Sequence, residues 1–274
     1  MTATARHTGV ASAQNTSADY TMLRLALWSV CLYAGLGLLG FAVFAGFWPP
    51  PGQDIDASAI TRYFQTHHTS IQVGMVLMVV GAPCYYTWSA AISKVIGRME
   101  GPIGVLSTTE LLGGLMTGVV TAVPAVVWQT AAFRAEARSP ETVQTLYDFG
   151  WLFFDLTYMF SLLQSVALGI AILLDRRTQP LFPRWVGYLC FLTAAIYVPL
   201  SLVPFVRTGP FAWHGLLNFW AVFVMFFVLV AIVTPYAFRA VGRLEREDLA
   251  PGTERGLSAE RQPAHRYRHL NGRL

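Results

Sequence analysis

The chain has 274 residues, of which 54% are hydrophobic and only 12% are charged, with a formal net charge of +4. Soluble domains usually carry about twice that charged fraction, so this composition cannot cover a water-facing surface. The basic residues lie at the ends of apolar runs and not on one soluble face, which argues against nucleic acid as a partner. We therefore expect one multi-pass domain in the cell membrane.

Six stretches contain the roughly 20 apolar residues that a helix needs to cross the hydrocarbon core. They are Leu23–Trp48, Ile71–Ile96, Val105–Phe133, Tyr147–Leu174, Trp185–Val206 and Phe211–Phe238. Only Arg207–Pro210 separates the last two, so they must form an antiparallel hairpin. The first run is about twice as long as a signal-peptide core, so we expect it to be a span. The predicted fold is an all-α, polytopic helix bundle over residues 23–240.

The charges flanking the spans predict the orientation of the bundle. Of the 19 Lys and Arg residues, only Arg62, Arg134, Arg138 and Arg207 flank the spans on the side opposite the termini. Cytoplasmic loops carry an excess of Lys and Arg. Both termini are therefore predicted to lie in the cytoplasm.

The segments outside the spans have little regular pattern. Residues 1–22 are rich in Ala, Thr and Ser, and residues 241–274 mix Arg, Glu, Pro and Gly without an apolar stripe. We expect a disordered N-terminus and a disordered basic tail that begins against anionic lipid. The loop Pro49–Ser70 contains one candidate helix, Ala57–Thr66, with Asp56 as its N-cap.

Common catalytic signatures are absent from the sequence. It contains no GxSxG, HExxH, P-loop, dinucleotide-binding or DDxxD-type motif, and neither a metal nor a cofactor is predicted. Cys31, Cys84 and Cys190 each lie in an apolar run and are interpreted as core residues. Any chemistry should therefore lie between the helices, where a polar side chain costs a few kcal/mol unless it faces protein or water, by order of magnitude.

Two acids fall inside the predicted spans, Glu110 in the third and Asp155 in the fourth. Asp155 follows Asp148 by seven residues, so both lie on one helix face, which continues through Trp151 and Tyr158. A face that mixes acidic and aromatic residues is unsuited to lipid, so it should look into the bundle. Glu110 lies near the predicted cytoplasmic end of its span. The four residues on the face of the fourth span lie in or near the opposite half of the bundle.

Three more residues fall in the same half as Asp155. Trp128 belongs to a stripe of the third span that begins at Glu110. His214 and Asn218 are four residues apart in the sixth span and should be neighbours on one helix face. The sequence thus predicts an outer polar cluster and one separate inner acid, without a continuous polar file between them.

Acids among aromatic rings suggest acid-initiated chemistry on an apolar molecule. A protonated carboxylic acid in an apolar cavity can protonate an alkene or epoxide, and aromatic faces stabilise the resulting cation. The candidate catalytic residues are Asp155 and Glu110; the candidate substrate-binding residues are Asp148, Trp151, Tyr158, Trp128, His214 and Asn218. The alternative for Asp155 is a hydrogen bond that joins two helices, and for Glu110 an interaction with the helix dipole or the headgroups.

Phe182–Leu189 (FPRWVGYL) and Thr208–Leu216 (TGPFAWHGL) resemble segments of a group of small actinobacterial multi-pass membrane proteins. More loosely, the size, helical class and buried acids resemble the integral-membrane terpene cyclases of bacterial indole-sesquiterpene and fungal meroterpenoid pathways. That resemblance implies a metal-independent cyclisation, begun by protonation of a lipophilic prenylated substrate, in terpenoid secondary metabolism.

Three functions remain open on the sequence. The first is a membrane terpene cyclase or isomerase, whose partners are a lipophilic small molecule and membrane lipids. The second is a small proton-coupled transporter, for which intramembrane carboxyl groups are equally expected, although the absence of an internal repeat argues against it. The third is a non-catalytic scaffold or partner subunit, with its protein partners open.

Overall fold

The computed structural model describes residues 2–250, with side chains described from residue 17 onward. Every regular element in this range is helical. Six helical segments are long and apolar enough to cross a membrane, namely Ser17–Phe44, His68–Glu100, Val105–Phe133, Pro140–Leu174, Arg184–Phe205 and Leu216–Leu249. The protein is therefore a multi-pass membrane protein, and each predicted span overlaps one of these segments.

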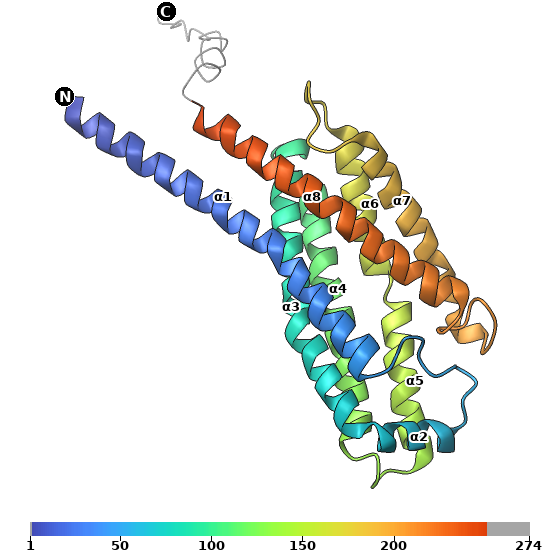
Figure 1. The fold of residues 1–274 in the computed structure, drawn as a ribbon. Coiled ribbons are helices and arrows are strands. Elements are labelled where there is room, and N and C mark those ends of the chain that lie inside the picture. Colours follow the sequence, from blue (N-terminus) through green and yellow to red (C-terminus); the bar gives the residue numbers. More distant parts are fainter. Residues whose placement is uncertain (1, 251–274) are drawn as a thin grey trace, which may run out of the picture.

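Figure 1 shows the order of the elements along the chain. They are α1 (Thr2–Leu38), the π-helix η1 (Leu39–Phe44), α2 (Ala57–Thr66), α3 (His68–Glu100), α4 (Val105–Phe133), α5 (Pro140–Leu156), α6 (Met159–Leu174), α7 (Arg184–Tyr197), the 3₁₀-helix η2 (Val198–Phe205), the π-helix η3 (Leu216–Ala221) and α8 (Val222–Leu249).

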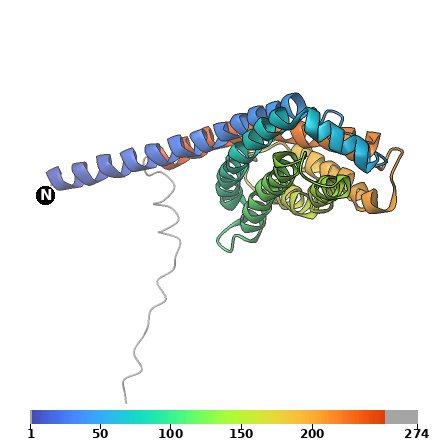
Figure 2. The same ribbon diagram turned by 90° about the horizontal axis from the view of Figure 1, so that it is seen from below.

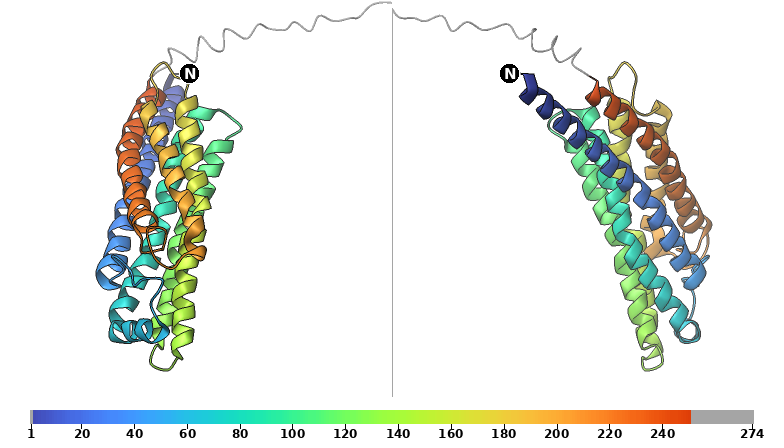
Figure 3. Two further views of the ribbon diagram at one scale, coloured as in Figure 1. Left: turned by 90° about the vertical axis from the view of Figure 1, so that its right-hand side faces the viewer. Right: turned by 60° about the vertical axis from the view of Figure 1, so that its left-hand side comes forward.

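The even number of spans brings the start of α1 and the end of α8 to one end of the bundle, here called the terminal end (Figure 1). The opposite end, here called the far end, carries α2, which lies across the helices. Helices α1 and α8 lie next to each other over one face, as both views of Figure 3 also show. Helices α3 and α4 form the neighbouring antiparallel pair, and α6 and α7 lie on the other side of α8.

The N-terminal segment differs from the prediction. Residues 2–22 were expected to be disordered, but α1 begins at Thr2, and its first part projects beyond the other helices (Figure 2). The segment contains no proline, so a helix nucleated in the first span can propagate through it. The Tyr20 side chain holds the inner part of the segment, because it is buried and its hydroxyl donates to Asp248 over 2.7 Å.

The predicted boundary of the C-terminal tail is also wrong. Helix α8 continues to Leu249, so residues 241–249 belong to the bundle, and 251–274 lie outside the described residues. Val241 and Leu244 are buried against the other helices. Because charged residues surround these two apolar ones in the sequence, no apolar helix face was predicted here.

Charged residues of this last part of α8 hold the terminal end together. Three ion pairs join it to other elements: Arg24–Glu245, Arg98–Asp248 and Arg177–Glu247. Arg98 binds both carboxylate oxygens of Asp248, over 2.9 and 2.8 Å. The helix therefore ties α1, α3 and the connection after α6 to one another.

The short helix α2 at the far end confirms the sequence prediction, including its N-cap. The Asp56 carboxylate accepts a hydrogen bond from the Ala59 backbone N–H over 2.9 Å. The Ser58 hydroxyl and this N–H together lower the pKa of Asp56. The Tyr63 hydroxyl donates to the Ala45 carbonyl over 2.6 Å, which fastens α2 to the end of the first span.

The charge bias predicts that the terminal end faces the cytoplasm. In a variant with Cys31, Cys84 and Cys190 replaced by Ala, we expect a single cysteine at the exposed Asp54 position to react with an impermeant maleimide on intact cells. A cysteine at Thr178, exposed at the terminal end, should react only after permeabilisation. The opposite labelling pattern would show that the bundle is inverted.

The packing of α8 predicts that Leu244 contributes more to stability than the ion pairs around it. Leu244→Ala should lower the free energy of unfolding by about 2–5 kcal/mol, because it leaves a cavity. Arg98→Ala should cost about 1 kcal/mol or less, because its ion pair is partly exposed. Unfolding in mixed micelles gives the values, with the exposed Leu249→Ala on the same helix as control. Equal effects of Leu244→Ala and Leu249→Ala would contradict the buried position of Leu244.

Candidate functional site

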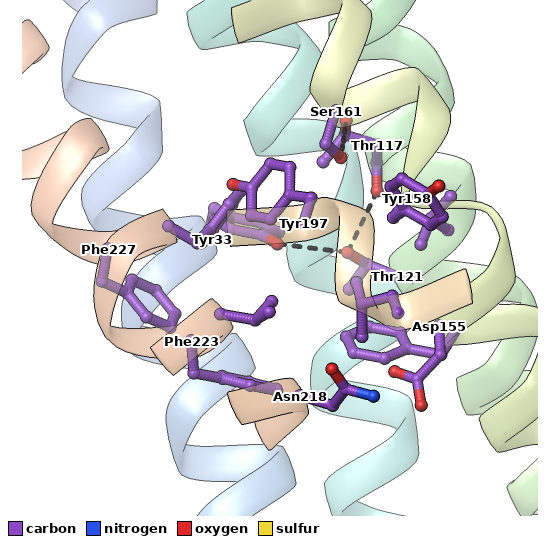
Figure 4. Close-up of a pocket in the computed structure, with 15 residues that line it drawn as sticks. Tyr33, Thr117, Thr121, Asp155, Tyr158, Ser161, Tyr197, Asn218, Phe223 and Phe227 are labelled. Atoms are coloured by element: carbon purple, nitrogen blue, oxygen red, sulfur yellow. Dashed lines mark hydrogen bonds between the residues drawn. The ribbon is translucent and has the colours of Figure 1, made fainter. Parts of the chain in front are cut away.

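A cavity of about 90 Å³ lies inside the bundle, and Asp155 forms part of its wall (Figure 4). Five of the six spans contribute side chains to it. Its lining consists of aromatic residues (Tyr33, Phe154, Tyr158, Tyr197, Phe223, Phe226 and Phe227), aliphatic residues (Val120, Leu200 and Val222) and polar residues (Thr117, Thr121, Asp155, Ser161 and Asn218). The cavity is thus mainly apolar, with a small set of polar groups on its wall.

The backbone around the cavity departs from the α-helix in three spans. The fourth span breaks at Thr157–Tyr158, the fifth ends in the 3₁₀-helix η2, and the sixth begins with the π-helix η3. Leu200 of η2 and Asn218 of η3 both line the cavity. At membrane depth, irregular backbone is tolerated only where it is buried in protein or lines a cavity, and π-helical turns are frequent at functional sites.

Asp155 lies directly before the break between α5 and α6. Its side chain is 4% exposed, and its Oδ2 has no hydrogen-bond partner among the described residues. Its backbone carbonyl accepts from the Tyr158 N–H over 3.3 Å, the tighter bond that ends α5. Asp155 therefore lies inside the bundle, on the wall of an aromatic cavity, as predicted. Its catalytic role stays a prediction.

Asn218 presents a second unpartnered acceptor to the same cavity. Its Nδ2 donates to the Pro199 and Phe211 carbonyl oxygens, and its Oδ1 has no partner among the described residues. Because the amide nitrogen is held by two carbonyls, the orientation of the amide is fixed. The Asp155 carboxyl and the Asn218 amide both extend into the cavity in Figure 4. A hydrogen bond to Asn218 Oδ1 must therefore come from a protonated carboxyl group or from a molecule in the cavity.

Aromatic rings form the remaining wall. Phe154 and Phe223 are stacked with their centroids 6.0 Å apart, and Tyr33 meets the edge of Phe226 at 6.2 Å. The Tyr33 hydroxyl lies 3.1 Å from Thr121 Oγ1, an interaction drawn in Figure 4. Ring faces carry negative charge density and attract cations, so this wall suits a positively charged intermediate.

Trp128 and Trp151 do not line the cavity, although the sequence analysis grouped them with Asp155. Their ring centroids are 5.0 Å apart, and Trp151 stacks on Trp213 at 5.9 Å. Both are fully buried in a packed aromatic cluster. A methyl group at Gly150 would overlap the Trp128 ring, so this contact depends on glycine. The two side chains therefore belong to the packed core.

His214 lies in a connection and not on a helix, which corrects the predicted start of the sixth span. The helical part begins only at Leu216, so His214 and Asn218 do not share a helix face. His214 Nδ1 accepts from the Gln53 N–H over 3.2 Å, and this bond joins two far-end loops. A methyl group at Gly215 would overlap the Pro210 region, a tight fold that delays the helix.

Asp148 and Tyr158 have different surroundings. Asp148 lies on α5 as predicted, but it is half-buried, its attractive charge is Arg207, and it does not line the cavity. Tyr158 does line the cavity, and its hydroxyl lies 2.6 Å from Ser201 Oγ. Of the six predicted substrate-binding residues, the structure brings only Tyr158 and Asn218 to the cavity.

Glu110 forms a second buried polar site. It is fully buried, and its Oε1 accepts from the Ser89 hydroxyl and from Gln164 Nε2, each over 2.9 Å. Its Oε2 has no partner among the described residues. The Tyr85 hydroxyl donates to Gln164 Oε1 over 3.1 Å. Glu110 therefore bonds to two neighbouring spans and does not reach the headgroups.

Thr117 joins the two buried sites, which corrects the prediction of two separate polar clusters. Its Oγ1 lies 2.8 Å from Ser161 Oγ and 3.4 Å from Gln164 Oε1. Thr117 and Ser161 line the main cavity, and Gln164 bonds to Glu110. Polar groups therefore continue from Glu110 to the cavity. Tyr158, Ser161 and Gln164 follow one another at intervals of three residues. This spacing indicates a shared polar helix face and could have predicted the connection.

Comparisons with family models, curated proteins and solved structures find no match to this chain. Within residues 2–250, no group of three or more His, Cys, Asp or Glu side chains is placed to hold a metal ion. The two buried carboxyl groups and the cavity are therefore the features that point to a function.

The contact between α3 and α4 predicts that Gly114 is required for the Glu110 site. A methyl group at Gly114 would overlap the Ser89 side chain and lie 3.0 Å from Gln164 Nε2. Gly114→Ala should therefore lower the free energy of unfolding by about 1–3 kcal/mol, as overpacking does. The control is Gly35→Ala in α1, where no atom lies within 4 Å. Equal stability of the two variants in mixed micelles would contradict the close contact.

Proposed function

We propose that the protein is an acid catalyst of the cell membrane that isomerises or cyclises a lipophilic prenylated molecule, with Asp155 as the proton donor. The single observation that carries this proposal is a buried carboxyl oxygen without a partner on the wall of an aromatic cavity. The loose resemblance to membrane terpene cyclases agrees with it. The proposed orientation places both termini in the cytoplasm.

The reaction begins when the Asp155 carboxyl group transfers its proton to an alkene carbon or an epoxide oxygen of the substrate. The carboxyl O–H bond breaks. With an alkene, a C–H bond forms at the expense of the π bond; with an epoxide, an O–H bond forms and a ring C–O bond breaks, and in either case the substrate becomes a carbocation. The rings of Phe223 and Phe227 stabilise this cation from the wall. A water molecule in the cavity then takes a proton from a neighbouring carbon, and the electrons of that C–H bond form the product alkene, so substrate and product have the same composition.

Asn218 orients the reacting group in this proposal. Its Oδ1 accepts from the Asp155 carboxyl or from a hydroxyl of the substrate, since both acceptors face the same space. The Asn218 side chain is itself held by two backbone carbonyls. A pre-oriented polar group of this kind requires no reorganisation when the proton moves.

The size of the cavity limits how the substrate binds. Ligand pockets typically measure about 300–1,000 Å³, whereas this cavity measures about 90 Å³. A second cavity of about 40 Å³ adjoins it, shares Phe154 and Phe223, and extends to Gly37 and Met78. We propose that the cavity with Asp155 receives the reacting end of the molecule. The prenyl chain then follows the second, smaller cavity toward α1. A complete prenyl chain requires the helices to move apart.

A proton-coupled carrier is the second candidate, and one observation favours it. Polar groups continue from Glu110 through Gln164 and Thr117 to the cavity, as expected for a carrier that moves protons. A scaffold, the third function that the sequence allows, would use neither the cavity nor the two buried acids. A substrate that is converted favours the catalyst, and one that is moved unchanged with a proton favours the carrier.

The test is turnover of farnesylated and epoxidised acceptors by the purified protein in D₂O. We expect a product of unchanged composition that contains one deuterium from solvent. Asp155→Asn keeps the shape but removes the transferable proton, so it should lower the rate by about 10²–10⁴-fold. Glu141→Gln, an exposed acid on the same helix, is the control. Turnover by Asp155→Asn at the wild-type rate would contradict the acid mechanism.

A further inference from the structure

Glu110 is a buried acid that the proposed reaction does not use. We propose that Glu110 is the inner end of a hydrated proton path that leads past Gln164, Ser161 and Thr117 to Asp155. The path goes beyond the proposed function, because it would serve a catalyst and a carrier alike.

The inner end of the path lies close to the terminal end of the bundle. Helix α4 begins at Val105, so Glu110 lies about 8 Å along the helix, at 1.5 Å per residue. Its Oε1 is held by Ser89 and Gln164, which leaves Oε2 unpartnered in a fully buried position. A buried acceptor without a donor is costly. A water molecule or the acid proton itself must therefore satisfy it.

A small cavity of about 20 Å³ lies beside Gln164 and forms the middle of the path. Tyr85, Gln164, Ser161 and Ser165 supply polar groups to its wall. A cavity of about 10–15 Å³ with two to four polar partners is enough to hold one water molecule. The space therefore suits one ordered water between Gln164, which bonds to Glu110, and the main cavity.

The outer end of the path is the cavity that contains Asp155. Ser161 and Tyr197 line both cavities, so the two spaces adjoin. The Tyr197 side chain is buried, and no hydrogen bond joins its hydroxyl to the described residues. Together with Asp155 Oδ2 and Asn218 Oδ1, it offers three polar groups to water. At about 30 Å³ per molecule, the 90 Å³ space holds a few waters when no substrate is bound.

Protons move along this path by successive transfers between waters and hydroxyl groups. Each transfer breaks one O–H bond and forms the next. The path requires a water molecule at the unpartnered Glu110 Oε2 as its first carrier, and Glu110 then takes a new proton from water at the terminal end. The Gln164 amide is a positioning group, because it has no proton to exchange in this way. It orients Glu110 through Nε2 and accepts from Tyr85 and Thr117 through Oε1.

The path explains how Asp155 recovers its proton. In the proposed reaction Asp155 becomes a carboxylate, and the proton lost from the carbocation leaves at a different carbon. The proposed path from Glu110 returns a proton to the Asp155 carboxylate, and the aromatic wall need not open. The same route would load and release the coupling proton of a carrier.

The test follows the carboxyl protons directly and does not need a substrate. Protein in lipid nanodiscs is transferred from H₂O to D₂O, and the infrared C=O bands of the protonated carboxyl groups are followed in time. Loss of a band in Asp155→Asn or Glu110→Gln assigns it to its residue. We expect Glu110 to exchange first and Asp155 to follow through the path.

Removing the connecting hydroxyl groups should separate the two acids. In Ser161→Ala and in Thr117→Val, the exchange at Asp155 should slow by about tenfold or more, since one link of a buried chain is lost, whereas Glu110 keeps its rate. Thr109→Val is the matched control, because Thr109 and Thr117 both lie on α4 and bond to the carbonyl four residues earlier.

Three outcomes would overturn the path. The first is unchanged exchange at Asp155 in Ser161→Ala, a small substitution chosen because Thr117→Val risks misfolding. The second is equal slowing of Glu110 and Asp155, which would indicate a general change in access. The third is the absence of a protonated Asp155 band, which would also remove the proposed proton donor. A normal exchange pattern without any turnover would instead contradict only the catalytic proposal.

Discussion

The buried polar site depends on the close approach of α4 to α3 and α6, which glycine alone permits. A methyl group at Gly113 would lie 2.7 Å from Gln164 Cβ and 2.9 Å from the Phe160 carbonyl oxygen, and one at Gly114 would overlap Ser89. In lipid, helices associate through close packing and interhelical hydrogen bonds, because lipid tails are as apolar as leucine side chains. At this crossing both occur together. The glycines bring the backbones close enough for Ser89 and Gln164 to reach Glu110.

The cavity has a different origin, because it lies where regular helix geometry stops. The break at Thr157–Tyr158, the 3₁₀-helix η2 and the π-helix η3 interrupt three spans around the same space. The freed backbone groups are tolerated because protein surrounds them. Glycine contacts thus close one part of the bundle, and irregular helices open another.

Much of this architecture could be predicted from the sequence, since long apolar runs have few alternatives in a membrane. The spans, the helix Ala57–Thr66 and the inward position of Asp155 all follow from hydropathy, capping and periodicity. The break after Asp155 could not be predicted, because neither Pro nor Gly marks Thr157–Tyr158. The start of the sixth helix at Leu216 depends on how Gly215 packs against Pro210, a tertiary contact.

Periodicity could place Glu110 on a stripe, but not its partners. Whether Gln164 meets Glu110 depends on how far α4 and α6 slide and rotate against each other, and no helix period contains that information. The small-residue pair Gly113–Gly114 marks the crossing, but only the structure shows which side chains it brings together. The same limit applies to Trp128 and Trp151. The sequence predicted them in the same half of the bundle as Asp155, yet they pack against each other and not toward the cavity.

The donors and acceptors on the cavity wall restrict what the site can bind. Asp155 Oδ2 and Asn218 Oδ1 are both acceptors without partners. If the carboxyl group is ionised, an occupant must donate to both, which selects cationic or multiply hydroxylated molecules and conflicts with the apolar aromatic wall. If the carboxyl group holds its proton, it needs only an acceptor on the substrate. An epoxide oxygen or an alkene meets that requirement and the apolar wall together. These groups therefore favour the proposed lipophilic acceptor, and the proposed Glu110 path would return a proton to Asp155 after each reaction.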